Sequence, residues 1–164
     1  MSDPIRNTYS RRRFLVAAGL TTLTACTTSS LVSPSITAGE IDVGGASLPY
    51  WDTGGAGTPL ILMHPFAGSI DSWPAQQAAF ANAGFRVIAY SRRGVGTTSP
   101  ITTPLNHAED LGRVLDALGI QRAHLVTVAG GATVAADFLI SHRDRVASAV
   151  FACSLISFQD PRLL

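Results

Sequence analysis

Lysine is missing from this sequence: all 12 basic residues of the 164-residue chain are arginines, and only 14% of its residues are charged. From Thr27 onward, eight arginines stand against ten acidic residues, which gives this part a net charge of −2. A basic surface for nucleic acid is therefore excluded, and no block of like charges suggests an interaction tail. The 46% share of apolar residues excludes disorder of the whole chain.

Cysteine and histidine are also scarce, with two and four copies. Their scattered positions match no spacing of metal ligands. The glycine-rich stretches 54–57 and 94–96 complete neither a phosphate-binding loop nor a dinucleotide fingerprint. The sequence therefore predicts no metal and no cofactor. Cys153 falls in an apolar, strand-like run and is expected to be a small buried side chain.

The first 38 residues have the features of an export signal and a tether. Ser10–Leu15 resembles a twin-arginine export motif, and the apolar run that follows is too short to span a bilayer. Leu23–Cys26 resembles a lipobox, in which Cys26 becomes lipidated after cleavage. Residues 27–38 are rich in serine and threonine and predict a flexible tether.

We therefore expect residues 1–26 to direct export by the twin-arginine route to the periplasm or cell surface. A lipid on Cys26 would then anchor the protein to the membrane. An ordinary N-terminal helix with a chance run of arginines is the alternative interpretation.

Residues 39–164 alternate apolar, strand-like runs with helical patterns. This alternation indicates crossover connections and an α/β, three-layer fold with a mostly parallel sheet. The expected strands are two short ones around Gly44 and Gly45 within Glu40–Asp52, then Pro59–Met63, Arg86–Tyr90, Ala123–Val128 and Val146–Ala152. The expected helices are Ser72–Ala83, His107–Leu118 and Gly130–His142.

Four stretches resemble the α/β-hydrolase family, in family order and at family spacing. They are Pro59–Trp73, Phe85–Ser99, Asp110–Val126 and Ser141–Val146. The resemblance implies an α/β-hydrolase fold that is truncated after about its sixth strand. It also implies an ancestral activity, the hydrolysis of a small ester, amide or similar acyl compound through a Ser-His-Asp triad.

In that family the nucleophile lies at the centre of Gly-x-Ser-x-Gly, on a tight turn between a strand and a helix. A gap-free alignment places Thr127–Gly131 at this turn, so Ala129 takes the serine position and Thr127 the first glycine. Alanine has no nucleophilic atom, and Ala129 is therefore not competent for this chemistry. By resemblance, the backbone N–H groups of Phe66 and Gly130 form the oxyanion hole, which can survive this loss.

The rest of the triad is also expected to be absent, because the family places the acid and the histidine on later strands. The four histidines are assigned to structural places instead, and Asp110 and Asp137 to helix surfaces or supporting roles. The four are His64, His107, His124 and His142.

Three interpretations stay open at this point: a decayed or truncated hydrolase, an exported protein that binds a ligand carbonyl or carboxylate without catalysis, and an enzyme with relocated groups or with a missing half supplied by another chain. The expected partners are a small acyl substrate or ligand and, through the open edge of the sheet, a second copy of the chain.

Overall fold

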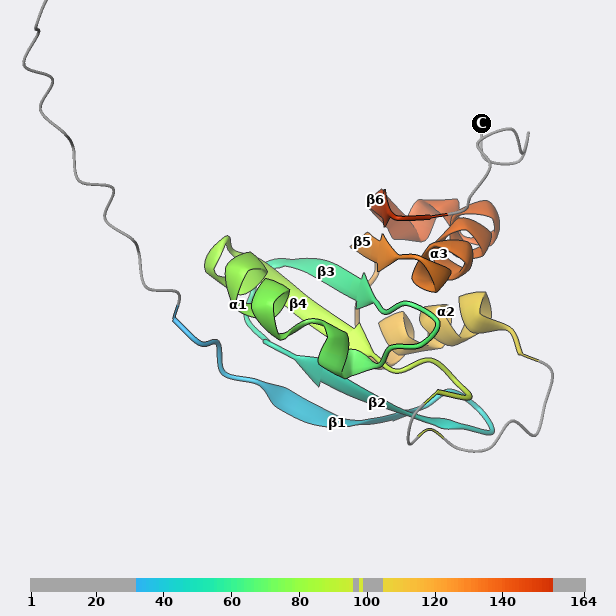
Figure 1. Cartoon of the computed structure of the whole chain (residues 1–164), viewed down its shortest axis with the longest axis horizontal. Coiled ribbons are helices and arrows are strands. Elements are labelled where there is room, and N and C mark those ends of the chain that lie inside the picture. The colour runs from blue at the N-terminus through green and yellow to red at the C-terminus, as the bar shows by residue number, and fades with distance from the viewer. Residues whose placement is uncertain (1–31, 96–97, 99–104, 155–164) are drawn as a thin grey trace, which may run out of the picture.

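A six-stranded mixed sheet forms the centre of the computed structural model, which describes residues 32–95, 98 and 105–154 (Figure 1). The strand order is β1-β2-β4-β3-β5-β6. β1 and β2 are antiparallel to their neighbours, whereas β4, β3, β5 and β6 run parallel. The strands are β1 (Thr37–Asp42), β2 (Ser47–Asp52), β3 (Thr58–Met63), β4 (Phe85–Tyr90), β5 (Ala123–Val128) and β6 (Val146–Ala152).

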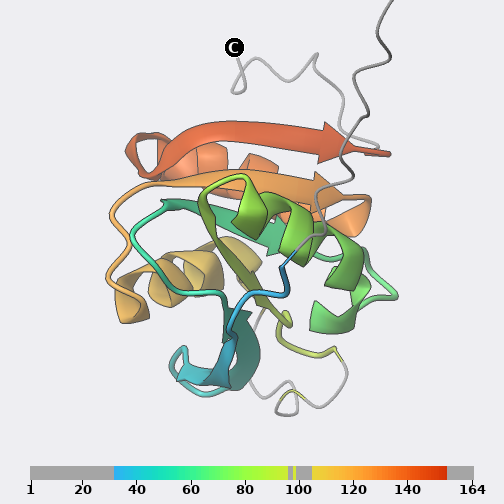
Figure 2. The ribbon, with the colours of Figure 1, turned by 90° about the vertical axis from the view of Figure 1, so that its left-hand side faces the viewer.

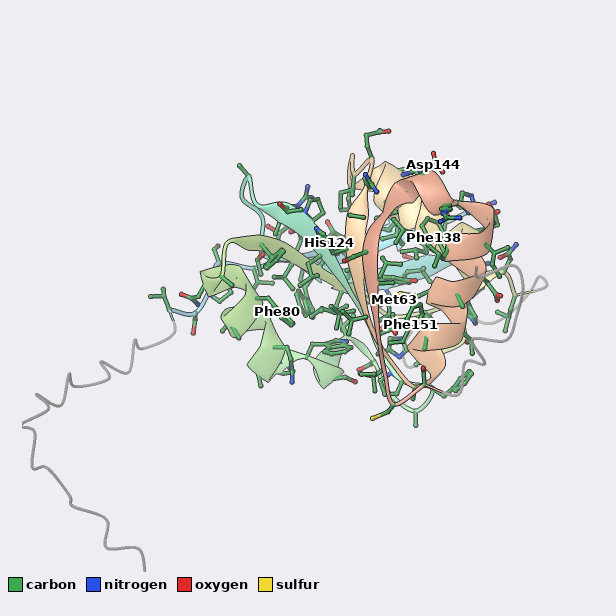
Figure 3. All side chains as sticks on the ribbon, turned by 90° about the horizontal axis from the view of Figure 1, so that it is seen from above. Met63, Phe80, His124, Phe138, Asp144 and Phe151 are labelled. Carbon is green, nitrogen blue, oxygen red and sulfur yellow. The ribbon has the colours of Figure 1, made fainter. Side chains whose placement is uncertain are left out.

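Helices cover the sheet on both faces, which gives the three layers that the sequence predicts. They are α1 (Pro74–Asn82), α2 (His107–Ala117) and α3 (Gly130–Ser141). Phe80 of α1 and Phe138 of α3 lie on opposite sides of the sheet (Figure 3). Within β3, Leu62 faces the α1 layer and Met63 the α2 and α3 layer. Both faces of this strand are buried, which explains its unbroken apolar run.

Local sequence signals account for the helix ends. The Asn106 side chain accepts a hydrogen bond from the Glu109 N–H and so caps the start of α2. Gly119, at φ 66°, ends this helix, and the Ile120 N–H donates to the Leu115 carbonyl at 2.8 Å. This is a Schellman motif. α1 begins later than predicted, at Pro74, because residues 70–72 form a separate 3-10 turn.

The N-terminal boundary differs slightly from the prediction. β1 begins at Thr37, two residues inside the expected tether, because Thr37 and Ala38 pair with Asp52 and Trp51 of β2. The expected signal, residues 1–26 with Cys26, lies outside the described residues, so export and lipidation stay predictions. No helix in the described part of the chain is long and apolar enough to cross a membrane.

β6 forms one edge of the sheet and the β1–β2 hairpin the other (Figure 2). Within the described ranges β6 pairs only with β5, and the Val150 side chain is 54% exposed. Association of two copies through this edge stays a prediction.

A buried ion pair ties α2 to the segment after β4. The Arg93 guanidinium donates to both carboxylate oxygens of Asp110, at 3.0 and 2.7 Å, and also contacts the Gly44 carbonyl in the β1–β2 turn. The carboxylate raises the pKa of Arg93 above its ordinary value. Of the two places expected for Asp110, the helix surface is wrong and the supporting role is confirmed, since the buried carboxylate holds Arg93.

Candidate functional site

The turn between β5 and α3 holds Ala129 in an unusual backbone conformation. Ala129 has φ 46° and ψ −112°, a region that residues other than glycine rarely adopt. Its N–H donates to the Ala152 carbonyl of β6 at 3.0 Å, and its own carbonyl accepts from the Ala132 N–H at 3.0 Å. The turn therefore has the sharp strand-to-helix shape that presents a side chain above the sheet, but that side chain is a methyl group.

Thr127 and Gly131 occupy the two glycine positions of the Gly-x-Ser-x-Gly motif, and their surroundings differ. A Cβ on Gly131 would lie 2.5 Å from the Met63 carbonyl oxygen, so only glycine fits there. Thr127 is fully buried, and its hydroxyl donates to the Val150 carbonyl at 2.9 Å. The hydroxyl is thus satisfied by β6, which explains how threonine replaces the first glycine of the motif.

A small cavity of about 140 Å³ opens at Ala129. It is lined by Phe66, Ala129, Gly130, Thr133 and Cys153. Cys153 was expected to be buried, and this is wrong: β6 ends at Ala152, and Cys153 turns out of the strand at φ 50° and is exposed. Cys153 therefore lines the same cavity as Ala129.

Phe66 separates this cavity from a larger, open groove of about 540 Å³. Phe66 is 69% exposed, and its ring packs over Gly130, where a Cβ would lie 2.3 Å from a ring carbon. Phe66 and Gly130, the two residues expected to supply the oxyanion donors, are thus neighbours in space although 64 positions apart in sequence. Within the described residues the Phe66 N–H has no acceptor.

His64 lies behind the Phe66 loop, fully buried. Its Nε2 accepts a hydrogen bond from the Arg92 backbone N–H at 3.0 Å, so the ring proton belongs on Nδ1, which donates to the Pro65 carbonyl at 2.7 Å. Burial lowers the pKa of His64 from 6.5 to about 4. The imidazole is therefore neutral at physiological pH and serves as a fixed hydrogen-bonding group rather than as a base.

Arg92 is a buried charge beside the candidate site that the sequence did not reveal. Its side chain is 2% exposed, and its guanidinium donates to the carbonyls of Pro65, His64 and Gly130 at 2.9, 3.3 and 3.5 Å. The guanidinium carbon also lies 5.2 Å from the centre of the Phe66 ring. Burial lowers its pKa. The only sequence signal for a buried charge at this place is the pair of arginines directly after the buried strand β4.

The other histidines and the metal-binding residue types do not gather at the cavity. His107 begins α2, His124 lies in β5, and His142 ends α3, stacked on Phe138 at 4.7 Å. None of them lines the Ala129 cavity. In the described ranges, no group of three or more His, Cys, Asp or Glu side chains could hold a metal ion.

Acidification from about pH 7 to 4.5 is expected to lower the free energy of unfolding by about 2–3 kcal/mol through His64. The unfolded chain takes up this proton near pH 6.5, whereas folded His64 stays neutral down to about pH 4. The stability is therefore fully present above pH 6.5 and is lost as the pH falls toward 4. Burial also lowers the pKa of His107, which adds in the same direction.

Urea unfolding across this pH range measures the effect, with His64→Gln as the matched control. The variant should lose less stability on acidification than the native chain. Equal losses in both would show that His64 is not the group responsible.

Comparison with known proteins places the fold. A family model described as alpha/beta hydrolase fold matches residues 58–163. The chain is 37% identical over 121 residues to an epoxide hydrolase of Caballeronia sordidicola, a match that covers 71% of this chain and 36% of the relative. It is 36% identical over 111 residues to a bifunctional esterase/perhydrolase of Acinetobacter calcoaceticus, a match that covers 65% of this chain and 40% of the relative.

Solved structures agree. A carboxylesterase structure from Nitrososphaera gargenis superposes with a TM-score of 0.61 at 29% identity, over 65% of this chain and 41% of that chain. A structure described as an N-acyl homoserine lactone degrading enzyme gives a TM-score of 0.65 at 29% identity, over 71% of this chain and 45% of that chain. In these matches the chain spans less than half the length of its relatives.

Proposed function

Because the chain belongs to the α/β-hydrolase fold family, we propose that it binds a small carbonyl or carboxylate compound at the Ala129 turn without hydrolysing it. The single observation behind this proposal is Ala129 itself, held at φ 46° where the family carries its nucleophile. A methyl group cannot attack an acyl carbon, whatever base lies beside it. The proposed function therefore includes no covalent catalysis through residue 129.

The binding part of the proposal rests on the features that remain around the turn. The proposal assigns the Phe66 and Gly130 N–H groups as the hydrogen-bond donors for an oxygen atom of the ligand, and donors of the protein backbone do not depend on the lost side chain. The adjoining cavity of about 140 Å³ is lined mainly by apolar atoms. An apolar cavity of about this size accepts a molecule as large as benzene. A compact acyl compound with one small apolar group fits both features.

Ala129→Ser is expected to raise the hydrolysis of p-nitrophenyl acetate by less than about tenfold over the native chain. A general base typically contributes about 10²–10⁴-fold, and no histidine in the described part lines the cavity to supply one. The measurement is the initial rate at matched protein concentration. Strong, saturable turnover by Ala129→Ser would show that a base does reach this position, and turnover by the native chain would contradict the proposal outright.

Binding itself is measured by thermal unfolding of the full chain. Saturating benzoate or benzamide should raise the unfolding temperature, because a ligand that binds only the folded state stabilises it. An unchanged unfolding temperature with both compounds would contradict the binding part of the proposal.

A further inference from the structure

We propose that the Ala129 cavity prefers carboxylates to neutral carbonyl compounds, and that Arg92 is the positioning residue that sets this preference. The inference rests on the proposed function and deepens it, since it names the chemical class of the ligand. It follows from three features of the described part of the chain: a buried charge that has no counter-charge there, a peptide group held by converging donors, and the start of a helix.

The buried charge comes first. Arg92 and Arg93 are adjacent and both buried, but only Arg93 is paired with a carboxylate, that of Asp110. Arg92 forms no salt bridge within the described residues, and its Nε has no hydrogen-bond partner there. A buried cation normally has a partner of opposite charge. Among the described residues, the structure therefore leaves a positive charge without a carboxylate partner directly behind the Phe66 loop.

The Pro65 carbonyl connects this charge to the cavity. It accepts three hydrogen bonds, from the His64 ring at 2.7 Å, the Arg92 guanidinium at 2.9 Å and the Gly68 N–H at 3.1 Å. The peptide group that carries this oxygen also carries the Phe66 N–H. Because a trans peptide is planar, its N–H points away from its carbonyl. Donors that hold the oxygen therefore also fix the direction of the Phe66 N–H.

The same bonds make the Phe66 N–H a stronger donor. Donation to a carbonyl polarises its peptide group, and a charged donor does so most. Arg92 thus acts on the ligand through the Pro65–Phe66 peptide and its own field, without direct contact. A full negative charge on the ligand gains more from both effects than a neutral carbonyl oxygen does.

The N-terminus of α3 supplies the second donor. Gly130 is the first residue of this 12-residue helix, so its N–H has no partner within the helix. The helix dipole adds partial positive charge at the same point. The Gly130 carbonyl is held by the Thr133 hydroxyl at 2.9 Å and by Arg92 at 3.5 Å, which ties this end of α3 to the guanidinium.

The surrounding titratable groups do not cancel the positive potential that Arg92 and the N-terminus of α3 produce at the cavity. His64 is neutral, and burial lowers the pKa of His107 as well. Burial raises the pKa of Tyr90, which keeps its hydroxyl protonated. Asp71 lines the outer groove, and no described acidic residue lines the cavity at Ala129. A carboxylate that enters the cavity is therefore not repelled by a negatively charged side chain among the described lining residues.

The test compares benzoate with benzamide, which have the same shape and differ in charge. Isothermal titration with the purified full chain at about pH 7.5 should give a dissociation constant at least about tenfold lower for benzoate. If benzamide binds as tightly as benzoate, this inference is overturned while the proposed function stands. If neither compound binds, the proposed function itself fails.

Variants of Arg92 test whether this residue causes the preference for benzoate over benzamide. Arg92→Gln keeps hydrogen-bond donors and removes the charge, so the benzoate preference should fall to within about threefold. Arg92→Lys keeps the charge and should retain part of the preference. Arg122→Gln is the matched control: Arg122 also donates to a backbone carbonyl, that of Val146, but it precedes β5 at the end opposite Ala129. This control should leave the preference unchanged, and an unchanged preference in Arg92→Gln would overturn the role of Arg92.

A measurement on the native chain covers the case in which Arg92→Gln does not fold. The amide proton of Phe66 should move downfield in the NMR spectrum on addition of benzoate, and less on addition of benzamide. A Phe66 amide that does not respond to saturating benzoate would overturn the inference, because the proposed donor would then not contact the ligand.

Discussion

Asp110→Ala is expected to lower the free energy of unfolding by about 3–5 kcal/mol, among the largest effects of any single substitution in this chain. Both side chains of the Arg93–Asp110 pair are 4% exposed, so removal of the carboxylate leaves a charged guanidinium in the interior. The loss also reaches beyond the pair, because Arg93 links α2 to the β1–β2 turn through the Gly44 carbonyl. Urea unfolding measures the change.

Asp116→Ala is the matched control for this prediction. Asp116 is also an α2 carboxylate bound to an arginine, Arg145, at 2.8 Å, but its side chain is 65% exposed. Its removal should cost less than about 1 kcal/mol, because exposed ion pairs contribute little. Equal losses in the two variants would mean that burial of the Arg93–Asp110 pair does not determine its contribution.

Gly131→Ala is expected to destabilise the fold by at least about 2–3 kcal/mol. The new Cβ would lie 2.5 Å from the Met63 carbonyl oxygen and 3.0 Å from that of His64. Both obstacles are backbone atoms of β3 and the loop after it, so no side-chain rotation relieves the contact. α3 must move away from the sheet, and the Ala129 turn moves with it. Loss of benzoate and benzamide binding should accompany the loss of stability.

Gly112→Ala provides the comparison, since it makes the same chemical change inside α2. A Cβ there meets only a ring carbon of Phe138, at 3.7 Å, which is an ordinary van der Waals contact. Alanine favours a helix interior over glycine by about 1 kcal/mol, so this variant should be as stable as the native chain or more so. If Gly131→Ala unfolds at the same urea concentration as Gly112→Ala, the close approach of α3 to β3 is not what requires glycine at position 131.

Much of the fold follows from short stretches of sequence. The run Leu60–Met63 predicts a strand buried on both faces, and the structure confirms it. The position of Ala129 between a strand and a helix follows from a gap-free alignment of Thr127–Gly131, because the turn has a constant length. Gly119 marks the end of α2 through a positive φ that glycine adopts easily.

The features that sequence reasoning missed depend on contacts between distant segments. Arg92 meets Gly130 across 38 positions, and no local pattern indicates that its charge is buried without a carboxylate partner among the described residues. Asp110 lies in an amphipathic helix with polar neighbours, and only the packing of α2 against the Arg93 segment places it inside. Cys153 ends an apolar run, and the run alone does not show that β6 stops one residue earlier.

The backbone conformation of Ala129 also bears on the order of folding. A non-glycine residue in such a region costs about 1–3 kcal/mol, which nothing within the turn itself offsets. The contacts that hold it come from outside: the Ala152 carbonyl of β6 on one side, and on the other the close approach of Gly131 to Met63 of β3. We therefore expect the turn to close only after β5 has paired with both neighbours. A ligand that needs this turn would therefore bind only to chains in which β5 is paired with both β3 and β6.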